Sequence, residues 1–233
     1  MRDPTVSDEA VRDPASFAEV SFAEVSFAEA GHDVAMDDEA VAALSLARTA
    51  RVDVLATGYA GDRVASTVIL VRDGDAVVVI DPGMVASRSA ILDPLAALAV
   101  SPDQVTDVVL SHHHPDHTIN IALFEHARVH DFWAIYKDDV WEDRPAEGFA
   151  ITPSIRLIET PGHTPQDITT LIGTPDGVVA ATHVWWTVDG PATDPFASDS
   201  AQLAASRQRV LALAGLVIPG HGAAFTPDDT TPR

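Results

Sequence analysis

Four potential metal ligands lie within six consecutive residues of this chain, directly after a short, largely apolar run. Residues 105–110, VTDVVL, are mostly apolar and predict a buried strand that leads directly into residues 111–117, which read SHHHPDH. A strand end is a rigid support from which side chains can be aimed at one point. The four potential ligands are His112, His114, Asp116 and His117.

The backbone of this segment predicts that its ligands converge. If it stays extended, His112 and His114 point to the same side, and Pro115 favours extension at His114. Pro115 can also open a helix, because its missing N–H would have no partner there. That turn would bring Asp116 and His117 back beside the first two histidines. The alternative, a solvated polar loop, explains such a dense ligand set poorly.

Two further histidines lie in glycine-proline turns that follow strand-like runs. His163 occurs in TPGHTP, and His221 occurs in PGHG. Each could project from the end of a strand. Either one alone would be interpreted as an ordinary turn histidine, but beside the first cluster ligation is the better interpretation.

Composition limits the chemistry and the partners. The chain has no cysteine, which excludes disulfides and thiolate metal sites and leaves imidazole and carboxylate ligands. The formal charge is -21 and Lys137 is the only lysine, so this acidic surface repels polyanions and weakly disfavours nucleic acid as a partner. No apolar run approaches the roughly 18 residues that a membrane span needs, and residues 1–10 lack the apolar part of a secretory signal. We therefore expect a cytoplasmic protein without a membrane partner.

The pattern along the chain predicts a tail and one domain. Residues 1–45 contain SFAEV twice and then SFAEA, and a five-residue period makes no stripe on a helix. We interpret them as a poorly ordered acidic tail, with a docking or swapping segment as the alternative. Residues 46–233 alternate strand-like and helix-like segments and predict an α/β domain with two packed sheets and outer helices. The expected strands are 52–59, 66–71, 76–80, 105–110, 129–133, 155–159, 168–172, 178–181 and 216–218, and the expected helices are 86–98 and 198–214.

Together these motifs resemble the metallo-β-lactamase superfamily, whose signature is H-x-H-x-D-H followed by separate histidines. The resemblance covers roughly residues 52–225 and looks closest to the branch of metallo-β-lactamase domain-containing protein 1. It implies a four-layer αββα sandwich with a metal site at one edge. It also implies that Asp81, in VVIDPG, supports the site without binding metal.

The resemblance implies one or two divalent ions, with zinc expected before iron or manganese. Imidazole suits several of these metals, so the ligand types do not choose among them. The implied ligands are His112, His114 and His163 for one ion and Asp116, His117 and His221 for the other.

The sequence departs from the family where an aspartate usually bridges the two ions. Strand 178–181 is followed by His183 in that place. A neutral imidazole offers one lone pair, so it can bind one metal but cannot bridge two as a carboxylate does. A second cation should then be held less tightly, and we expect one dominant ion or an unequal pair. The alternative is that His183 turns away and binds nothing.

The resulting hypothesis is hydrolysis by a metal-bound hydroxide, with Asp116 binding metal and orienting the nucleophile. The expected substrate is a small ester, thioester, lactone or amide-type molecule. A metal-dependent nuclease and a non-catalytic metal-binding relative are the alternatives. A di-iron oxidoreductase is disfavoured, because such relatives usually place a glutamate where this chain has His114.

Aromatic residues near the motifs suggest a substrate wall. Trp185 and Trp186 follow His183, and on an extended backbone only one of them would face the site, where it could line a pocket; ordinary packing is the alternative. The aromatic stretch 132–141 could cover the site or form a core or dimer contact, which leaves a homodimer open. His113 is expected to support the site or the fold, and the histidines without motif support are His32, His126 and His130.

Overall fold

A computed structural model describes residues 46–233. The tail predicted at residues 1–45 lies outside the described residues, so that prediction and the domain boundary after it stay predictions. Among the helices that are described, none has the length and apolar character needed to cross a bilayer.

The first sheet has seven strands in the order β1-β4-β5-β6-β7-β8-β9. Its neighbours pair antiparallel except for β5 with β6 and β6 with β7, which are parallel. The strands are β1 (Arg51–Ala56), β4 (Val68–Asp73), β5 (Ala76–Ile80), β6 (Asp107–Val109), β7 (Arg128–His130), β8 (Ala134–Lys137) and β9 (Val140–Asp143). A small hairpin between β1 and β4 pairs β2 (Tyr59–Ala60) with β3 (Val64–Ala65).

The second sheet has five strands in the order β10-β11-β12-β13-β14. Only β13 and β14 run parallel. The strands are β10 (Ala150–Thr152), β11 (Ile155–Glu159), β12 (Ile168–Thr174), β13 (Gly177–Thr182) and β14 (Leu216–Pro219).

Three α-helices complete the described chain: α2 (Ser89–Ala97), α3 (Pro115–Thr118) and α4 (Ser200–Leu213). Two 3₁₀ turns, Pro102–Gln104 and Ile121–Leu123, lie between α2 and β7. Helix α4 begins where the Asp199 side chain accepts hydrogen bonds from two backbone N–H groups, those of Ala201 and Gln202.

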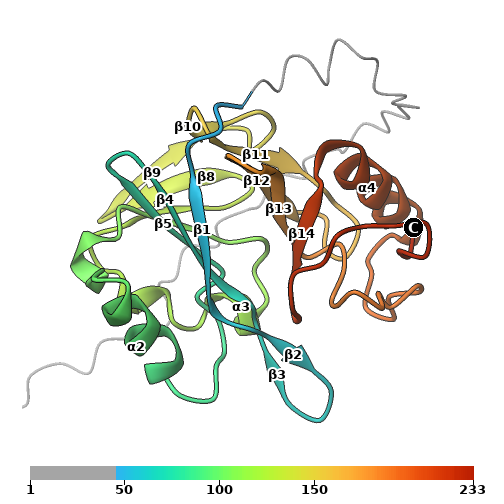
Figure 1. Ribbon diagram of the computed structural model, residues 1–233, viewed down its shortest axis with the longest axis horizontal. Coiled ribbons are helices and arrows are strands. Elements are labelled where there is room, and N and C mark those ends of the chain that lie inside the picture. Colours follow the sequence, from blue (N-terminus) through green and yellow to red (C-terminus); the bar gives the residue numbers. More distant parts are fainter. Residues whose placement is uncertain (1–45) are drawn as a thin grey trace, which may run out of the picture. The chain divides into compact units, whose positions relative to one another are not determined.

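The buried apolar residues form three clusters, because successive residues of a strand point to opposite faces of its sheet. In the first sheet Val71 and Val78 face the second sheet, whereas Leu70 and Val79 face α2, which buries Ile91 against them and against neighbouring apolar residues. The outer face of the second sheet packs in the same way against α4. Figure 1 shows α2 and α4 on opposite flanks of the paired sheets. The predicted four-layer αββα sandwich is confirmed.

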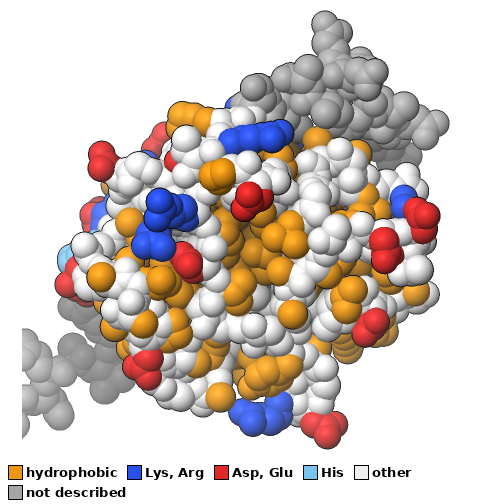
Figure 2. Space-filling model, viewed as in Figure 1, with side chains coloured by type: hydrophobic (Ala, Val, Ile, Leu, Met, Phe, Trp, Pro, Cys, Tyr) orange, Lys and Arg blue, Asp and Glu red, His pale blue; other side chains and the backbone are white. Residues whose placement is uncertain are grey.

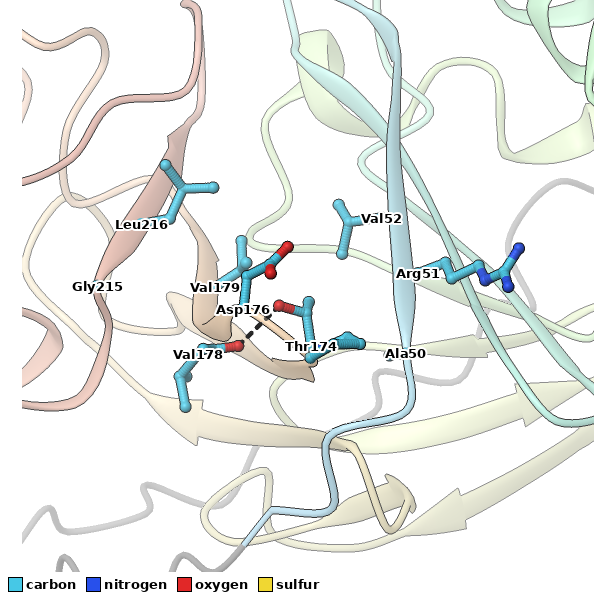
Figure 3. Close-up of a pocket in the computed structure, with 11 residues that line it drawn as sticks. Ala50, Arg51, Val52, Thr174, Asp176, Val178, Val179, Gly215 and Leu216 are labelled. Atoms are coloured by element: carbon cyan, nitrogen blue, oxygen red, sulfur yellow. Dashed lines mark hydrogen bonds between the residues drawn. The ribbon is translucent and has the colours of Figure 1, made fainter.

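A groove of about 490 Å³ opens between the edges of the two sheets, where β1 approaches the turn between β12 and β13. Figure 2 shows hydrophobic side chains exposed in the middle of this face. In Figure 3 Val52 and Leu216 border the groove and Arg51 points away from it. None of the predicted site residues lines this groove, so the chemistry lies elsewhere in the fold.

Candidate metal centre

The ends of parallel strands place the candidate ligands at one edge of the sandwich. Strand β6 leads to His112, β13 ends immediately before His183, and β14 leads to His221. Because β13 and β14 are parallel, their carboxyl ends lie side by side, and β5 and β6 do the same in the other sheet. His163 comes from the loop between β11 and β12.

The segment after β6 takes the conformation that Pro115 predicts. His114 is extended, with φ -66° and ψ 144°, and Pro115 is the first residue of helix α3. The single turn that follows places His117 beside His112, with ring centroids 4.4 Å apart.

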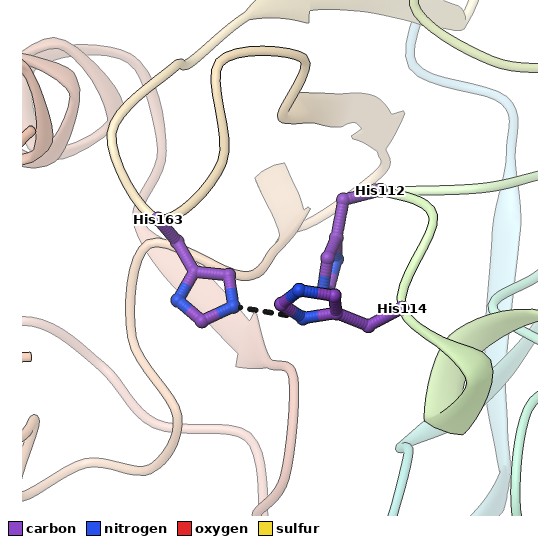
Figure 4. Close-up of side chains that lie close together, drawn as sticks. All are labelled: His112, His114 and His163. Carbon is purple, nitrogen blue, oxygen red and sulfur yellow. Dashed lines mark hydrogen bonds between the residues drawn. The ribbon is translucent and has the colours of Figure 1, made fainter. Parts of the chain in front are cut away.

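Three histidines form the first candidate ligand set. The ligand atoms of His112, His114 and His163 lie within 4.8 Å of one another, and Figure 4 shows the three rings facing a common point. The Nε2 atom of His163 lies 3.2 Å from the Nδ1 atom of His114. Two nitrogens bound to one zinc ion at 2.0–2.1 Å in a tetrahedron are about 3.4 Å apart, so this spacing suits a shared ion.

Asp116, His117 and His221 form the second candidate set. The Oδ2 atom of Asp116 lies 3.4 Å from the Nε2 atom of His117 and 3.5 Å from the Nε2 atom of His221. These separations also match two donors on one tetrahedral ion.

His183 stands between the two sets. Its ring centroid lies 4.4 Å from that of His112, 4.7 Å from His117, 4.3 Å from His163 and 5.0 Å from His221. The side chain is buried, and Gly220 lets it approach, because a Cβ at residue 220 would meet the ring at 2.3 Å. The alternative that His183 turns away from the centre is therefore wrong.

Asp81 orients the rings of His117 and His112 through hydrogen bonds on their Nδ1 sides. Its Oδ2 atom accepts a hydrogen bond from the Nδ1–H of His117 at 2.8 Å and one from the hydroxyl of Ser111 at 2.7 Å. Because the Ser111 hydroxyl donates its proton to Asp81, its oxygen is left to accept the Nδ1–H of His112, at 3.1 Å. In its neutral form each of the two rings therefore carries its free lone pair on Nε2.

Asp194 is a supporting residue that sequence reasoning missed. Its Oδ2 atom accepts hydrogen bonds from the Nδ1–H of His163 at 2.8 Å and from the indole N–H of Trp186 at 3.0 Å. Asp194 lies 31 residues from His163 in a segment without regular pattern. The only sequence signal was its nearness to the two tryptophans.

Trp186 and Trp185 face opposite ways. Trp186 contacts the rings of His163 and His221 at centroid distances of 6.4 and 6.3 Å, and it stacks on Phe196 at 5.7 Å. Trp185 is fully buried in the core under α4, and its indole N–H donates to the carbonyl of Pro232. Of the two tryptophans only Trp186 borders the site, which agrees with the expectation that only one of them faces it, and Trp185 takes the alternative role of ordinary packing.

Burial favours the neutral form of four imidazoles in the centre, and the neutral form is the one that binds metal. It lowers the pKa of His112 and of His183 well below the ordinary value of 6.5, and the neighbouring histidines add to the effect. Burial also lowers the pKa of His163 and of His221.

The residues fit a divalent ion. The Nε2 atoms of His112 and His117 are buried, carry lone pairs and have no hydrogen-bond partner. Leaving such groups unpaired costs free energy that a bound cation would recover. Imidazole and carboxylate donors suit zinc, iron and manganese.

The remaining described histidines lie outside the cluster. His113 bonds Asp131 at 2.9 Å, and His130 bonds Asp107 at 2.7 Å within the sheet. His126 is exposed beside Glu125, and His32 lies outside the described residues.

Comparisons with known proteins agree with this geometry. A family profile described as "Metallo-beta-lactamase superfamily" matches residues 61–149. "Metallo-beta-lactamase domain-containing protein 1" of Xenopus laevis is 32% identical over 188 residues, which are 75% of this chain and 80% of that protein. A putative metallo-beta-lactamase from Thermotoga maritima superposes with a TM-score of 0.61 at 22% identity, covering 77% of this chain and 100% of that one. An N-acyl homoserine lactone hydrolase, solved with its product at the catalytic metal centre, gives 0.56 at 15% identity, covering 76% and 94%. At these sequence identities the two structural similarities support the fold alone.

Proposed function

Because the chain belongs to the metallo-β-lactamase superfamily, we propose that it is a hydrolase that uses a divalent metal ion to cleave a small ester, thioester, lactone or amide-type substrate. Zinc is proposed before iron or manganese. The observation that carries the proposal is the convergence of ring nitrogens and one carboxylate at a single edge of the sandwich. When bound, a divalent ion supplies a water of lowered pKa and polarises the substrate's carbonyl oxygen.

Two sets of side chains are available to hold ions. One consists of His112, His114 and His163, and the other of Asp116, His117 and His221. His183 lies between them. Asp81 and Asp194 hold the rings in place through the Nδ1 atoms of His117 and His163.

Asp116 is the proposed catalytic carboxylate. Its Oδ2 atom faces His117 and His221, and its side chain is 18% exposed, so it is within reach of both the centre and entering solvent. In this position it can orient an attacking water and accept its proton. The water's oxygen would then add to the substrate's carbonyl carbon, and cleavage of the acyl bond would release the leaving group.

The stacked rings of Trp186 and Phe196 are the proposed wall of the substrate pocket. Their planes differ by 11°, and Phe196 is 69% exposed while Trp186 contacts two candidate ligands. Such a surface suits an apolar acyl or ring group. The structural neighbour described as an N-acyl homoserine lactone hydrolase acts on a substrate with such a group.

Location in the cytoplasm and formation of a homodimer stay predictions.

The test is a substrate panel assayed with and without metal. The panel contains 4-nitrophenyl esters, an acyl thioester, N-acyl homoserine lactones, a β-lactam and, for the alternative nuclease, an RNA oligonucleotide. We expect hydrolysis of an acyl substrate that is lost after dialysis against a chelator and restored by zinc. In Asp116→Asn we expect kcat to fall on the order of 100-fold or more. Asp143→Asn, on exposed β9, is the matched control and should retain full activity.

Three results would contradict the proposal. Undiminished hydrolysis by the chelated protein would remove the metal from the reaction. Cleavage of the RNA alone would assign the centre to phosphodiester chemistry. Absence of turnover by the metal-loaded protein across the panel would make the chain a metal-binding relative without catalysis.

A further inference from the structure

We propose that the first divalent ion binds between the two candidate sets, in a site made of three imidazole nitrogens: His112 Nε2, His117 Nε2 and His183 Nδ1. The inference rests on the proposed function only in taking the centre to hold a divalent ion. The family pattern does not combine these three ligands. His112 comes from the first set, His117 comes from the second set, and His183 stands where the family has its bridging aspartate.

The first observation is that these three nitrogens lack partners. Within the described part of the cluster, they are the buried ring nitrogens that accept or donate no hydrogen bond. The side chains belong to the buried interior, with residue exposures of 1% for His112, 0% for His117 and 3% for His183. Ligand atoms of the same three rings lie within 4.8 Å of one another.

The second observation is that hydrogen bonding determines which nitrogen of His183 carries the lone pair. His221 Nδ1 lies 2.9 Å from the carbonyl oxygen of Ala65, which can only accept, so this nitrogen carries the proton and His221 Nε2 carries a lone pair. His183 Nε2 lies 3.0 Å from that lone pair and must donate to it. Its proton is therefore on Nε2, and Nδ1 is the acceptor.

All three unpartnered nitrogens are thus lone-pair donors. In the neutral rings, His117 Nε2 and His112 Nε2 carry lone pairs because the Nδ1–H groups donate to Asp81 and to the Ser111 hydroxyl. A water molecule has two protons and cannot satisfy three acceptors at once. A cation satisfies all three, and imidazole nitrogen is a preferred ligand of divalent zinc.

The arrangement suits a three-histidine site with an open position. Zinc bonds of 2.0–2.1 Å place neighbouring nitrogens about 3.4 Å apart, so the rings need to close from a spread of 4.8 Å or less. Three protein ligands leave the fourth position for water or substrate, as in catalytic zinc sites. The Asp116 carboxylate, 3.4 Å from His117 Nε2, lies next to that ion.

Occupation of this site limits the number of ions. His112 and His117 each have one free lone pair, and each pair serves one ion. The central ion therefore removes one ligand from each of the two outer sets, and His114 is left as an outer residue. We expect about one tightly held ion per chain, with a second bound weakly.

The experiment compares the affinity of the first ion in His183→Asn and His114→Asn. Zinc is titrated into metal-free protein against a chromophoric chelator, elemental analysis gives the stoichiometry, and circular dichroism checks the fold. We expect His183→Asn to lower zinc affinity about 100-fold or more, and His114→Asn to change it less than about 3-fold, because His114 belongs to neither the central ligands nor their supports. If His183→Asn does not fold, His183→Gln replaces it. X-ray absorption of the one-zinc protein should give nitrogen ligands dominated by imidazole.

Opposite results would overturn the inference. If His114→Asn weakens the first ion as much as the His183 variant, that ion sits in the outer set with His163. Two ions bound with equal affinity by the unaltered chain would also place the ions in the outer sets and not in the central site. These measurements use no substrate, so a protein that binds one ion as expected but hydrolyses nothing would fail the proposed function and still support the central site.

Discussion

Asp81 is the residue proposed to support the metal centre without binding an ion. Its carboxylate accepts the Nδ1–H of His117 and the hydroxyl and backbone N–H of Ser111, and through that hydroxyl it also orients His112. Such supports typically change metal affinity 10–100-fold when they are removed. Asp81 holds its position with a left-handed φ of 50°, immediately after β5.

In Asp81→Asn we expect zinc affinity to fall roughly 10–100-fold, with the fold retained. An amide keeps one acceptor oxygen but presents an N–H group to one of its former donors, so His117 or Ser111 loses its acceptor. Competition with a chelator measures the effect. Asp53→Asn is the control, since Asp53 bonds Arg72 at the partly exposed edge strand β1. An unchanged zinc affinity in a folded Asp81 variant would show that the carboxylate does not support the centre.

The sequence predicted that the candidate ligands converge, but it did not predict which ring nitrogens are free or which residues support them. The H-x-H-x-D-H spacing and the histidines of two turns were enough to place them at one edge, and the structure brings them together. The free nitrogen of His183 could not be predicted, because it depends on Ala65, which is distant in sequence. Asp194 was missed for the same reason, as its contacts with His163 and Trp186 exist only after folding.

At the scale of elements, helix α3 is held to β5 by a close approach at Gly83. A Cβ at this glycine would lie 1.7 Å from the backbone oxygen of Asp116, and the N–H of Met84 donates to that oxygen at 2.8 Å. The loop after β5 and the helix that carries two candidate ligands therefore pack backbone to backbone. The position of Asp116 and His117 depends on this contact.

We expect Gly83→Ala to displace α3, to lower stability by about 1–3 kcal/mol and to weaken zinc binding. Urea denaturation of metal-free protein and chelator competition measure the two effects. Gly61→Ala is the matched control, because a Cβ there meets nothing within 4 Å, and it should change neither. Full zinc affinity in the Gly83 variant would show that α3 can shift without disturbing its ligands.

Some strands were predicted closely, and one predicted strand is divided in the structure. Strand β11 matches its predicted bounds, as does β5. The single strand predicted at 129–133 is instead β7 followed by a turn and β8. The cause is Asp131, whose Oδ1 atom accepts the backbone N–H groups of Trp133 and Ala134 and turns the chain. One aspartate in an apolar run is a weak sequence signal for such a turn.

For the whole molecule, the predicted sandwich of two sheets and outer helices was correct, but the order of strands came only from the structure. Alternation and turn residues say which face of a strand is buried and do not say which strand is its neighbour. The parallel pairs β5–β6 and β13–β14 are the part of the topology that matters most, since each pair ends two segments that are 29 or 37 positions apart at the same edge of its sheet.

The buried histidines also predict how the metal-free molecule responds to acid. Burial lowers the pKa of five described histidines: His112, His130, His163, His183 and His221. In the unfolded chain these groups titrate near 6.5, so below that pH the unfolded state binds protons that the folded state excludes. Stability is then fully present above about pH 6.5 and is lost as the pH falls through 6.5 towards the lowered values.

Each excluded proton contributes up to about 1.4 kcal/mol per pH unit, so the two most strongly shifted groups, His112 and His183, together give up to about 3 kcal/mol per unit. We expect urea midpoints of metal-free protein to agree at pH 8.5 and 7.5 and to fall between 6.5 and 5.5, before most carboxylates titrate. Asp167, whose pKa burial raises to about 7, opposes part of this fall, because its folded form takes up a proton that the unfolded form does not. His183→Asn should reduce that slope, because its amide does not ionise. Saturating zinc should raise the midpoint at pH 7.5 by stabilising the folded state, and this gain should disappear on acidification, since protons and zinc compete for the same nitrogens. A midpoint that stays constant down to pH 5.5 would mean that the cluster is already open to protons in the folded chain.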